Sequence, residues 1–292
     1  MCLLIVLSRV VPGAPLVVAA NRDERLDRPA RAMTVLRDGG PRVLGGVDEL
    51  AGGTWLAVND RGVVAGLTNL PAAGGRDPSR RSRGELPLAL AACPDASTAA
   101  AVASEFRPDD YNPCWLLVGD RRSLHYVDLT GTGPPAVTEL GPGVHVLGNS
   151  PLGAPSPKVD HVRRLVDRVA GAGGPALFGA LARVLADHTV TTPLGDPAPA
   201  WGAGPSHASG RAGGPALASA APPGVPVRRP ETSACCVHTD DYGTRSSLLV
   251  GVADDEHRPP VLSVADGSPC TADFVDATDL WVAGGASRAG SG

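Results

Sequence analysis

The residue with the clearest capacity for chemistry is Cys2, which directly follows the initiator methionine. A small second residue normally permits removal of Met1, which would leave Cys2 with a free α-amine. The unperturbed pKa of an α-amine is about 7.7–8.0, so part of it is neutral near pH 7 and can accept the thiol proton. Cys2 would then hold a nucleophile and its base in one residue. The alternative is a small apolar side chain in a buried strand.

A second group of polar side chains, Asn21-Arg22-Asp23-Glu24, follows an apolar run at residues 16–20. The apolar runs 3–11 and 16–20, separated by the turn sequence PGAP, predict a β-hairpin with two buried arms. Its second arm runs back toward the chain start and should bring the polar group beside Cys2. There an arginine lowers a thiol pKa and a carboxylate can orient the amine. A salt-bridged hairpin end is the alternative interpretation.

The elements that must position these residues follow from apolar runs, turn signals and prolines at helix starts. Strands are predicted at residues 54–58, 63–68, 114–118, 123–129, 144–147, 233–238, 246–252 and 261–264. Helices are predicted at 157–170 and 175–187, and as a pair within 84–106 that is broken at Pro94. Strands and helices do not alternate strictly, which favours stacked, mainly antiparallel sheets with outer helices.

Composition and charge limit the classes of partner. Of the 292 residues 43% are hydrophobic and 19% are charged, and the formal net charge is −4, as in ordinary globular proteins. The sequence has no long block of like charge, which argues against nucleic acid as a partner. The apolar start is too short to span a bilayer, and the six cysteines form no regular framework. We therefore expect no membrane insertion and a cytoplasmic location.

The whole chain, residues 1–292, is expected to form a single domain. Residues 189–230 carry many prolines and glycines and almost no periodicity, so they are predicted to be a low-complexity surface loop. A flexible tail is predicted after about residue 283.

Nine short motifs occur in the order found in the NRDE protein family, namely MC, AANRDE, GGTWLAV, GLTN, RGEL, YN, VHVLGNS, PK and YGTRSS. The chain therefore resembles this family, which includes the transport and Golgi organisation protein 2 group of eukaryotes, over roughly residues 1–265. The resemblance implies an N-terminal nucleophile hydrolase fold, an α+β four-layer αββα sandwich of two mainly antiparallel sheets. The pattern also resembles the cysteine branch of that fold, which includes penicillin V acylases and bile salt hydrolases.

This resemblance implies roles for individual residues. Asn69 in AGLTNLP matches an oxyanion-hole asparagine, and loss of one such donor costs about 10²–10³ in rate. Asn149 in VLGNSP matches a second asparagine, and Arg245 in YGTRSS matches a late-strand arginine near the nucleophile. Taken alone, Asn69 and Asn149 are turn residues. The acylases usually read Arg-Asn-x-Asp where this chain reads Asn-Arg-Asp-Glu, so the order is permuted. The catalytic candidates are Cys2, Arg22, Asp23, Asn69, Asn149 and Arg245, and the predicted substrate contacts are Asn21, Glu24, Trp55 and Thr68.

Other chemical signals are weaker. Cys235-Cys236-Val237-His238 could suggest a metal site, but adjacent strand residues point to opposite faces and no second pair has zinc spacing. We therefore predict a buried strand there and no metal or cofactor. His145 is expected to pack in the core or to support a residue that contacts the ligand, and direct contact with a ligand is the alternative. The stretch GGVDELAGG at residues 45–53 is predicted to be a flexible or substrate-covering loop rather than a nucleotide cradle.

Three functions remain open at this stage, and none of them fixes the oligomeric state. In the first, an amidase, acyl hydrolase or acyltransferase, Cys2 attacks a non-peptide C–N or thioester bond of a small-molecule substrate. In the second, a non-catalytic binding or trafficking protein, the fold holds a hydrophobic ligand such as haem, a lipid or acyl-coenzyme A, although the chain has no C-x-x-C-H motif. The third is a catalytically dead scaffold.

Overall fold

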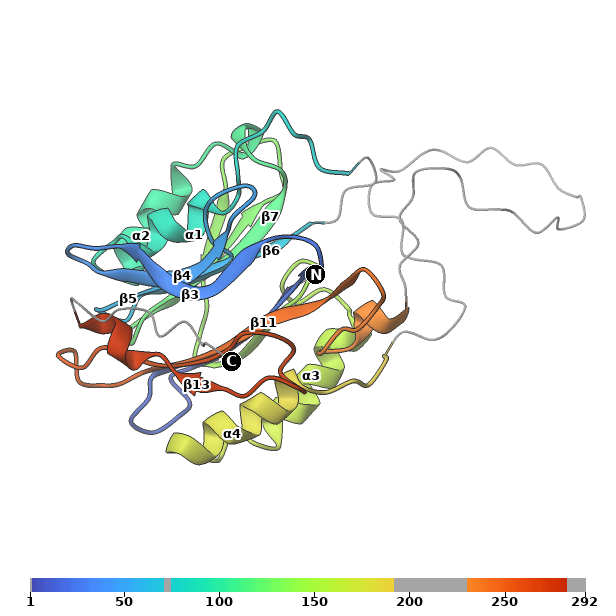
Figure 1. Ribbon diagram of the computed structural model, residues 1–292. Coiled ribbons are helices and arrows are strands. Elements are labelled where there is room, and N and C mark those ends of the chain that lie inside the picture. The colour runs from blue at the N-terminus through green and yellow to red at the C-terminus, as the bar shows by residue number, and fades with distance from the viewer. Residues whose placement is uncertain (1, 71–74, 192–229, 283–292) are drawn as a thin grey trace, which may run out of the picture.

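The computed structural model describes residues 2–70, 75–191 and 230–282, which form two sheets lying face to face (Figure 1). The first sheet contains, in spatial order, β10 (Gly143–Leu147), β1 (Leu3–Ser8), β2 (Leu16–Arg25), β11 (Tyr242–Val252), β12 (Val261–Ala265) and β13 (Val275–Asp276). The second contains β3 (Ala30–Arg37), β4 (Val43–Asp48), β5 (Leu56–Asn59), β6 (Val64–Asn69), β7 (Cys114–Gly119), β8 (Leu124–Leu129) and β9 (Ala136–Glu139). All neighbouring strands pair antiparallel.

Helices cover the outer face of each sheet. They are α1 (Glu85–Ala91) and α2 (Ala96–Ser104) on the second sheet and α3 (Pro157–Asp167) and α4 (Gly174–Leu185) on the first. The short 3₁₀ turns are η1 (Pro108–Asp110), η2 (Pro230–Ser233) and η3 (Thr278–Trp281). The predicted α+β, four-layer αββα sandwich of two antiparallel sheets is therefore confirmed. Helix starts follow local signals, since Ser156 accepts a hydrogen bond from the backbone of Val159 and Pro157 occupies the first turn.

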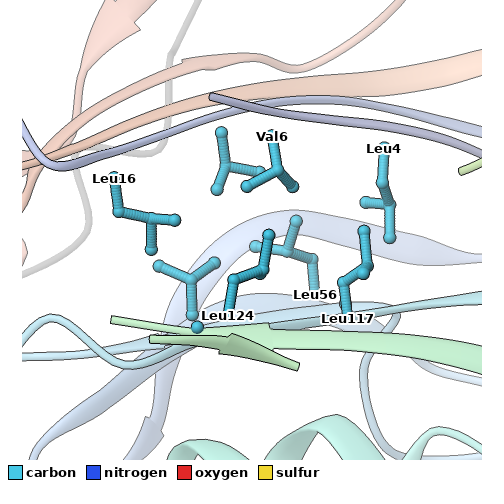
Figure 2. A pocket seen from close by; sticks show the side chains of 10 residues that line it. Leu4, Val6, Leu16, Leu56, Leu117 and Leu124 are labelled. Carbon is cyan, nitrogen blue, oxygen red and sulfur yellow. The ribbon is translucent and has the colours of Figure 1, made fainter. Parts of the chain in front are cut away.

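The strand β1 is apolar on both faces because it lies between two layers. Alternate residues enter different cores: Leu4 and Val6 pack between the sheets, whereas Leu3 and Ile5 pack under α3 and α4. Figure 2 shows the inter-sheet core, where one sheet contributes Leu4, Val6 and Leu16 and the other Leu56, Leu117 and Leu124. The void left between these side chains is about 10 Å³, which is roughly enough for one water molecule.

The predicted hairpin is confirmed as β1 and β2, but β2 is longer than its apolar run. It continues through the charged residues to Arg25, because β11 pairs with it from Leu16 opposite Val252 to Arg25 opposite Tyr242. The polar group therefore lies within a central strand rather than beyond its end.

Several sequence predictions of secondary structure are wrong. The stretch 233–238 is not a strand: η2 ends at Ser233, and beyond it only His238 makes an isolated bridge, to Gly243. The predicted loop at 45–53 is a strand up to Asp48, with turn residues after it. Its glycines suggested a loop, yet Gly46 is required by close packing, since a Cβ there would lie 1.7 Å from the Trp55 ring. Strands β3, β9 and β13 were not predicted either.

The core of the predicted low-complexity loop, residues 192–229, and nearly all of the predicted tail, residues 283–292, lie outside the described residues. In the parts of the chain that the structure describes, none of the helices has the length and apolar character needed to cross a lipid bilayer.

Candidate active site

The β1–β2 pairing places the start of the chain beside the polar group of β2. Leu3 pairs with Asn21, so the next position outward sets Cys2 against Arg22. Cys2 is 7% exposed and lines a pocket of about 270 Å³. The charged residues that line the same pocket are Arg22, Asp23, Glu24, Arg28, Asp48, Arg76 and Arg83. A pocket of this size and polarity can hold a small molecule or the reacting end of a larger one.

Burial, two charged neighbours and a hydrogen bond all act on the pKa of the Cys2 thiol. Burial raises the pKa of this thiol, and the negative charge of Asp23 adds to the rise. A hydrogen bond from the backbone of Asp23 and the positive charge of Arg22 lower it. Because burial is the largest of these effects, the resting group is a protonated thiol that needs a base to become a nucleophile.

Asp23 is held by two neighbours from distant parts of the chain. Its Oδ1 accepts a 2.6 Å hydrogen bond from the Thr244 hydroxyl on β11, and its Oδ2 lies 3.9 Å from the Lys158 ammonium on α3. Burial raises the pKa of the Asp23 carboxyl, while Lys158 and the Thr244 hydrogen bond lower it. These two contacts fix the orientation of the Asp23 side chain, which lines the same pocket as Cys2.

Arg22 is 4% exposed and rests against a rigid aromatic wall. Its guanidinium lies 4.7 Å from the centre of the Trp55 ring, and that ring fills the space above Gly46. One amino group is 3.9 Å from Glu24, whereas Nη1 is buried without a hydrogen-bond partner among the described residues. A buried N–H donor of this kind is available to a ligand in the pocket.

The motifs GGTWLAV and RGEL meet at the pocket through Gly53 and Gly84. Gly53 has φ +82°, and a Cβ there would lie 2.5 Å from the backbone of Gly84. The backbone N–H of Thr54 donates to the Gly84 carbonyl over 2.9 Å. This contact places Arg83, whose Nη1 donates to the Pro113 carbonyl, in the pocket lining.

Asn69 closes the pocket at the end of β6. Its backbone carbonyl accepts a 2.6 Å hydrogen bond from the Asn149 side chain, which fixes the end of the strand. The Asn69 side-chain oxygen is buried and has no hydrogen-bond partner in the described parts of the chain. Asn69 therefore lines the pocket with its side-chain oxygen not hydrogen-bonded to any described residue, whereas Asn149 supports it from outside the lining.

A protein-family model described as Transport and Golgi organisation 2 matches residues 1–259. The chain belongs to this family. The Bos taurus Transport and Golgi organization protein 2 homolog is 31% identical over 258 residues, which cover 83% of each chain. The Homo sapiens homolog is 28% identical over 256 residues, with the same coverage. The family resemblance drawn from the short motifs is therefore confirmed.

The fold has a solved counterpart. The crystal structure of the C2A mutant of conjugated bile acid hydrolase from Clostridium perfringens matches with a TM-score of 0.53 at 12% identity. The match covers 97% of this chain and 94% of that chain. The likeness shows that the two chains share a fold.

Four of the predicted site residues lie outside the pocket lining, namely Asn149, described above, and Asn21, Thr68 and Arg245. The Asn21 amide donates to the carbonyls of Leu185 and Cys235 and accepts from Ser247, so its hydrogen bonds are used within the protein. Thr68 is fully buried, and strand alternation turns it away from the face of Asn69. Neither Asn21 nor Thr68 therefore lines the pocket, and their contact with a substrate stays a prediction.

Arg245 also makes its hydrogen bonds within the protein and does not line the pocket. It lies at an irregularity in the β11–β2 pairing and donates to the backbone carbonyls of Arg25, Leu26 and Arg28. This anchors the β2–β3 turn and corrects the expectation of an arginine beside the nucleophile. His145, on β10, contacts the Gly141 carbonyl at 2.9 Å and is likewise absent from the pocket lining.

Sequence reasoning missed one pocket residue and two residues that contact Asp23, although all three belong to the quoted motifs. Arg83 belongs to RGEL, Lys158 to PK and Thr244 to YGTRSS. Because these residues lie in the quoted motifs, they could have been singled out as candidates. Their roles, however, depend on contacts between segments that are far apart in the sequence. Arg28 and Asp48, which form a 2.7 Å ion pair at the pocket, had no such signal.

Proposed function

We propose that this protein is a cysteine N-terminal nucleophile enzyme that hydrolyses or transfers an acyl group from a non-peptide C–N or thioester bond. The observation that carries the proposal is the position of Cys2, buried at one side of a 270 Å³ pocket and faced by Arg22, Asp23 and Asn69. The mechanism requires removal of Met1, which lies outside the described residues, so that the Cys2 amine is free.

In the first step the free amine of Cys2 takes the thiol proton, and the thiolate attacks the substrate carbonyl. Asp23, fixed by Thr244 and Lys158, holds the resulting ammonium in place through its carboxylate. The carbonyl oxygen gains negative charge as the sulfur–carbon bond forms. The Asn69 amide N–H donates to this oxyanion, and Asn149 keeps the Asn69 backbone in position.

In the second step the tetrahedral intermediate collapses and the bond to the leaving group breaks. The ammonium returns its proton to the departing amine or thiol, which leaves a thioester between Cys2 and the acyl group. Water, or an acceptor amine, then attacks that thioester with the Cys2 amine as base. This releases the acid or the new amide and restores the thiol.

The charges of the pocket favour a substrate that carries an anionic group. Four arginines and three carboxylates line it. Within the described residues, Arg76 and Arg83 form no ion pair with a carboxylate, unlike Arg28 with Asp48. Guanidinium groups that have no carboxylate partner at a pocket can bind a carboxylate, sulfonate or phosphate of a ligand.

The alternative remains a carrier of haem, a lipid or acyl-coenzyme A without catalysis. The structure offers less support for an apolar cargo, because the inter-sheet core leaves only about 10 Å³ and the larger pocket is lined largely by charged side chains. Saturable binding of haem that survives both Cys2→Ala and His145→Ala would favour the carrier and exclude both residues as obligatory haem ligands.

A burst experiment tests the catalytic proposal. Protein with Met1 removed, as verified by intact mass, should release roughly one equivalent of p-nitrophenol from p-nitrophenyl acetate before slower turnover. Cys2→Ala should show no burst, and Cys93→Ala, which alters a buried cysteine beneath α1, should keep it. A burst that persists in Cys2→Ala, or is absent from verified wild type, contradicts the proposal.

A further inference from the structure

Four metal-ligating side chains gather at one point of the surface, outside the pocket lining. They are His188, Cys236, His238 and Cys270, and their ligand atoms all lie within 4.8 Å of one another. His188 follows α4, Cys236 and His238 precede β11, and Cys270 lies between β12 and β13. Three segments far apart in the sequence thus supply two thiols and two imidazoles.

The distances within this cluster match a tetrahedral site. Two thiolates bound to zinc at about 2.3 Å lie roughly 3.8 Å apart at a tetrahedral angle. The Cys236 and Cys270 sulfurs are 3.7 Å apart. The His238 Nε2 lies 3.4 Å from the Cys236 sulfur and 3.2 Å from the Cys270 sulfur, so the three atoms surround one point.

The fourth side chain of the cluster is His188. The His188 and His238 rings are 5.1 Å apart, and His188 Nδ1 lies 3.3 Å from the Cys236 carbonyl. If Nδ1–H donates to that carbonyl, His188 Nε2 is left as the ligand atom. Backbone carbonyls commonly orient metal-binding imidazoles in this way.

The local chain geometry corrects the sequence interpretation of these residues. The sequence predicted a buried strand here, on which adjacent residues would face opposite ways and could not share a metal, but 233–238 is not a strand. Cys235 packs into the core under α3 and α4. Cys236 is buried but, like the exposed His238, it reaches His188 and Cys270.

We propose that His188, Cys236, His238 and Cys270 form a structural Zn²⁺ site. Two thiols and two imidazoles complete the tetrahedron with protein ligands alone, which is the arrangement of a structural rather than a catalytic zinc. Binding converts the two thiols to thiolates and releases two protons to solvent, without any change of oxidation state.

The site would stabilise the region behind the catalytic pocket. Val237, between two of the ligands, donates from its backbone to the Thr244 hydroxyl and accepts from the Thr244 backbone. The same hydroxyl donates to Asp23. Fixing residues 236–238 therefore fixes the partner that orients Asp23.

Metal content and the Co²⁺ spectrum of the full-length protein test this proposal. We expect one zinc per chain by elemental analysis after purification under reducing conditions. Replacement by Co²⁺ should give the visible d–d bands and the sulfur-to-metal charge-transfer band of a tetrahedral S₂N₂ site. Cys270→Ser, in an exposed connection, and Cys236→Ser should each weaken Zn²⁺ binding by about 100-fold or more.

Cys235→Ala is the matched control, because it removes the neighbouring cysteine whose side chain points into the core. It should keep both the zinc and the Co²⁺ spectrum. The proposal is overturned if wild type holds no stoichiometric metal, or if Cys270→Ser binds Zn²⁺ as tightly as wild type. It is also overturned if peptide mapping of reduced, metal-supplied protein finds a Cys236–Cys270 disulfide, whose sulfurs would lie about 2.05 Å apart.

Discussion

Cys2 and Cys236 are both buried, and each precedes a strand of the first sheet, but their neighbours give them different chemistry. Burial raises the pKa of both thiols. Around Cys2 stand a guanidinium, a carboxylate and an open pocket of about 270 Å³. Around Cys236 stand a second thiol and two imidazoles, all within 4.8 Å. The first setting suits attack on a ligand, and the second suits permanent coordination.

The comparison shows that burial and residue type alone do not distinguish a nucleophile from a metal ligand. Charged neighbours and free volume mark the nucleophile, because a reaction needs a base, a donor for the oxyanion and room for substrate. Additional soft ligands at tetrahedral spacing mark the metal site. Thr244 and Val237 connect the two regions through a pair of hydrogen bonds.

The largest effect should come from Cys2→Ala, which separates the two regions. It should remove the burst with p-nitrophenyl acetate entirely, because no other thiol lines the pocket within the described residues. It should leave the Co²⁺ spectrum unchanged, since Cys2 is not one of the four ligands. A variant that lost both signals would show that the sites are not separable.

Asn69→Ala should lower the acylation rate by about 10²–10³, since one oxyanion donor is lost. Asn149→Ala should have a smaller effect of the same sign, because it acts through the Asn69 backbone. Stopped-flow measurement of p-nitrophenol release gives both rates. Equal rates in Asn69→Ala and wild type would exclude Asn69 as an oxyanion donor.

Asn21→Ala should act on stability rather than chemistry. It leaves two buried carbonyls, of Leu185 and Cys235, without their donor, and it should cost about 1–3 kcal/mol of unfolding free energy. Chemical denaturation measures the cost. A normal unfolding midpoint combined with a lost burst would restore Asn21 as a substrate contact.

The smallest effects should be two shifts of opposite sign in the pH dependence of Cys2 alkylation by iodoacetamide. Arg22 lowers the pKa of the Cys2 thiol, so Arg22→Gln should move the midpoint upward. The Asp23 charge raises that pKa, and Asp23→Asn keeps the backbone donor, so the midpoint should move downward.

Alkylation is followed by mass spectrometry of the peptide that begins at Cys2, in protein lacking Met1. Arg25→Gln, at an exposed position of the same strand, is the control and should not move the midpoint. Shifts of the same sign in Arg22→Gln and Asp23→Asn would contradict the electrostatic account of the pocket.

The β1–β2 hairpin and the position of its polar residues could be predicted from the sequence. Alternating and continuous apolar runs predicted the β1–β2 hairpin, and antiparallel pairing then required Arg22 and Asp23 to lie near Cys2. Strand β4 was missed because Gly45 and Gly46 read as a loop, whereas Gly46 makes room for the Trp55 ring. Composition does not distinguish a flexible glycine from one required by packing.

Contacts between segments far apart in the chain could not be predicted from the sequence. His188 lies 48 residues before Cys236, and Cys270 lies 34 residues after it, so no spacing motif joins them. Arg245 was expected at the nucleophile, but a shift in the strand register turns it toward the β2–β3 turn. Register and long-range pairing decide these roles, and neither leaves a local pattern.

The most direct test of the central claim is to locate the acyl group after reaction. Wild type lacking Met1 is mixed with p-nitrophenyl acetate, quenched in acid during the burst, digested and mapped by mass spectrometry. We predict one acetyl group on the peptide that begins at Cys2 and none on that peptide in Cys2→Ala. Acetylation elsewhere with Cys2 unmodified would contradict the assignment of Cys2 as the nucleophile.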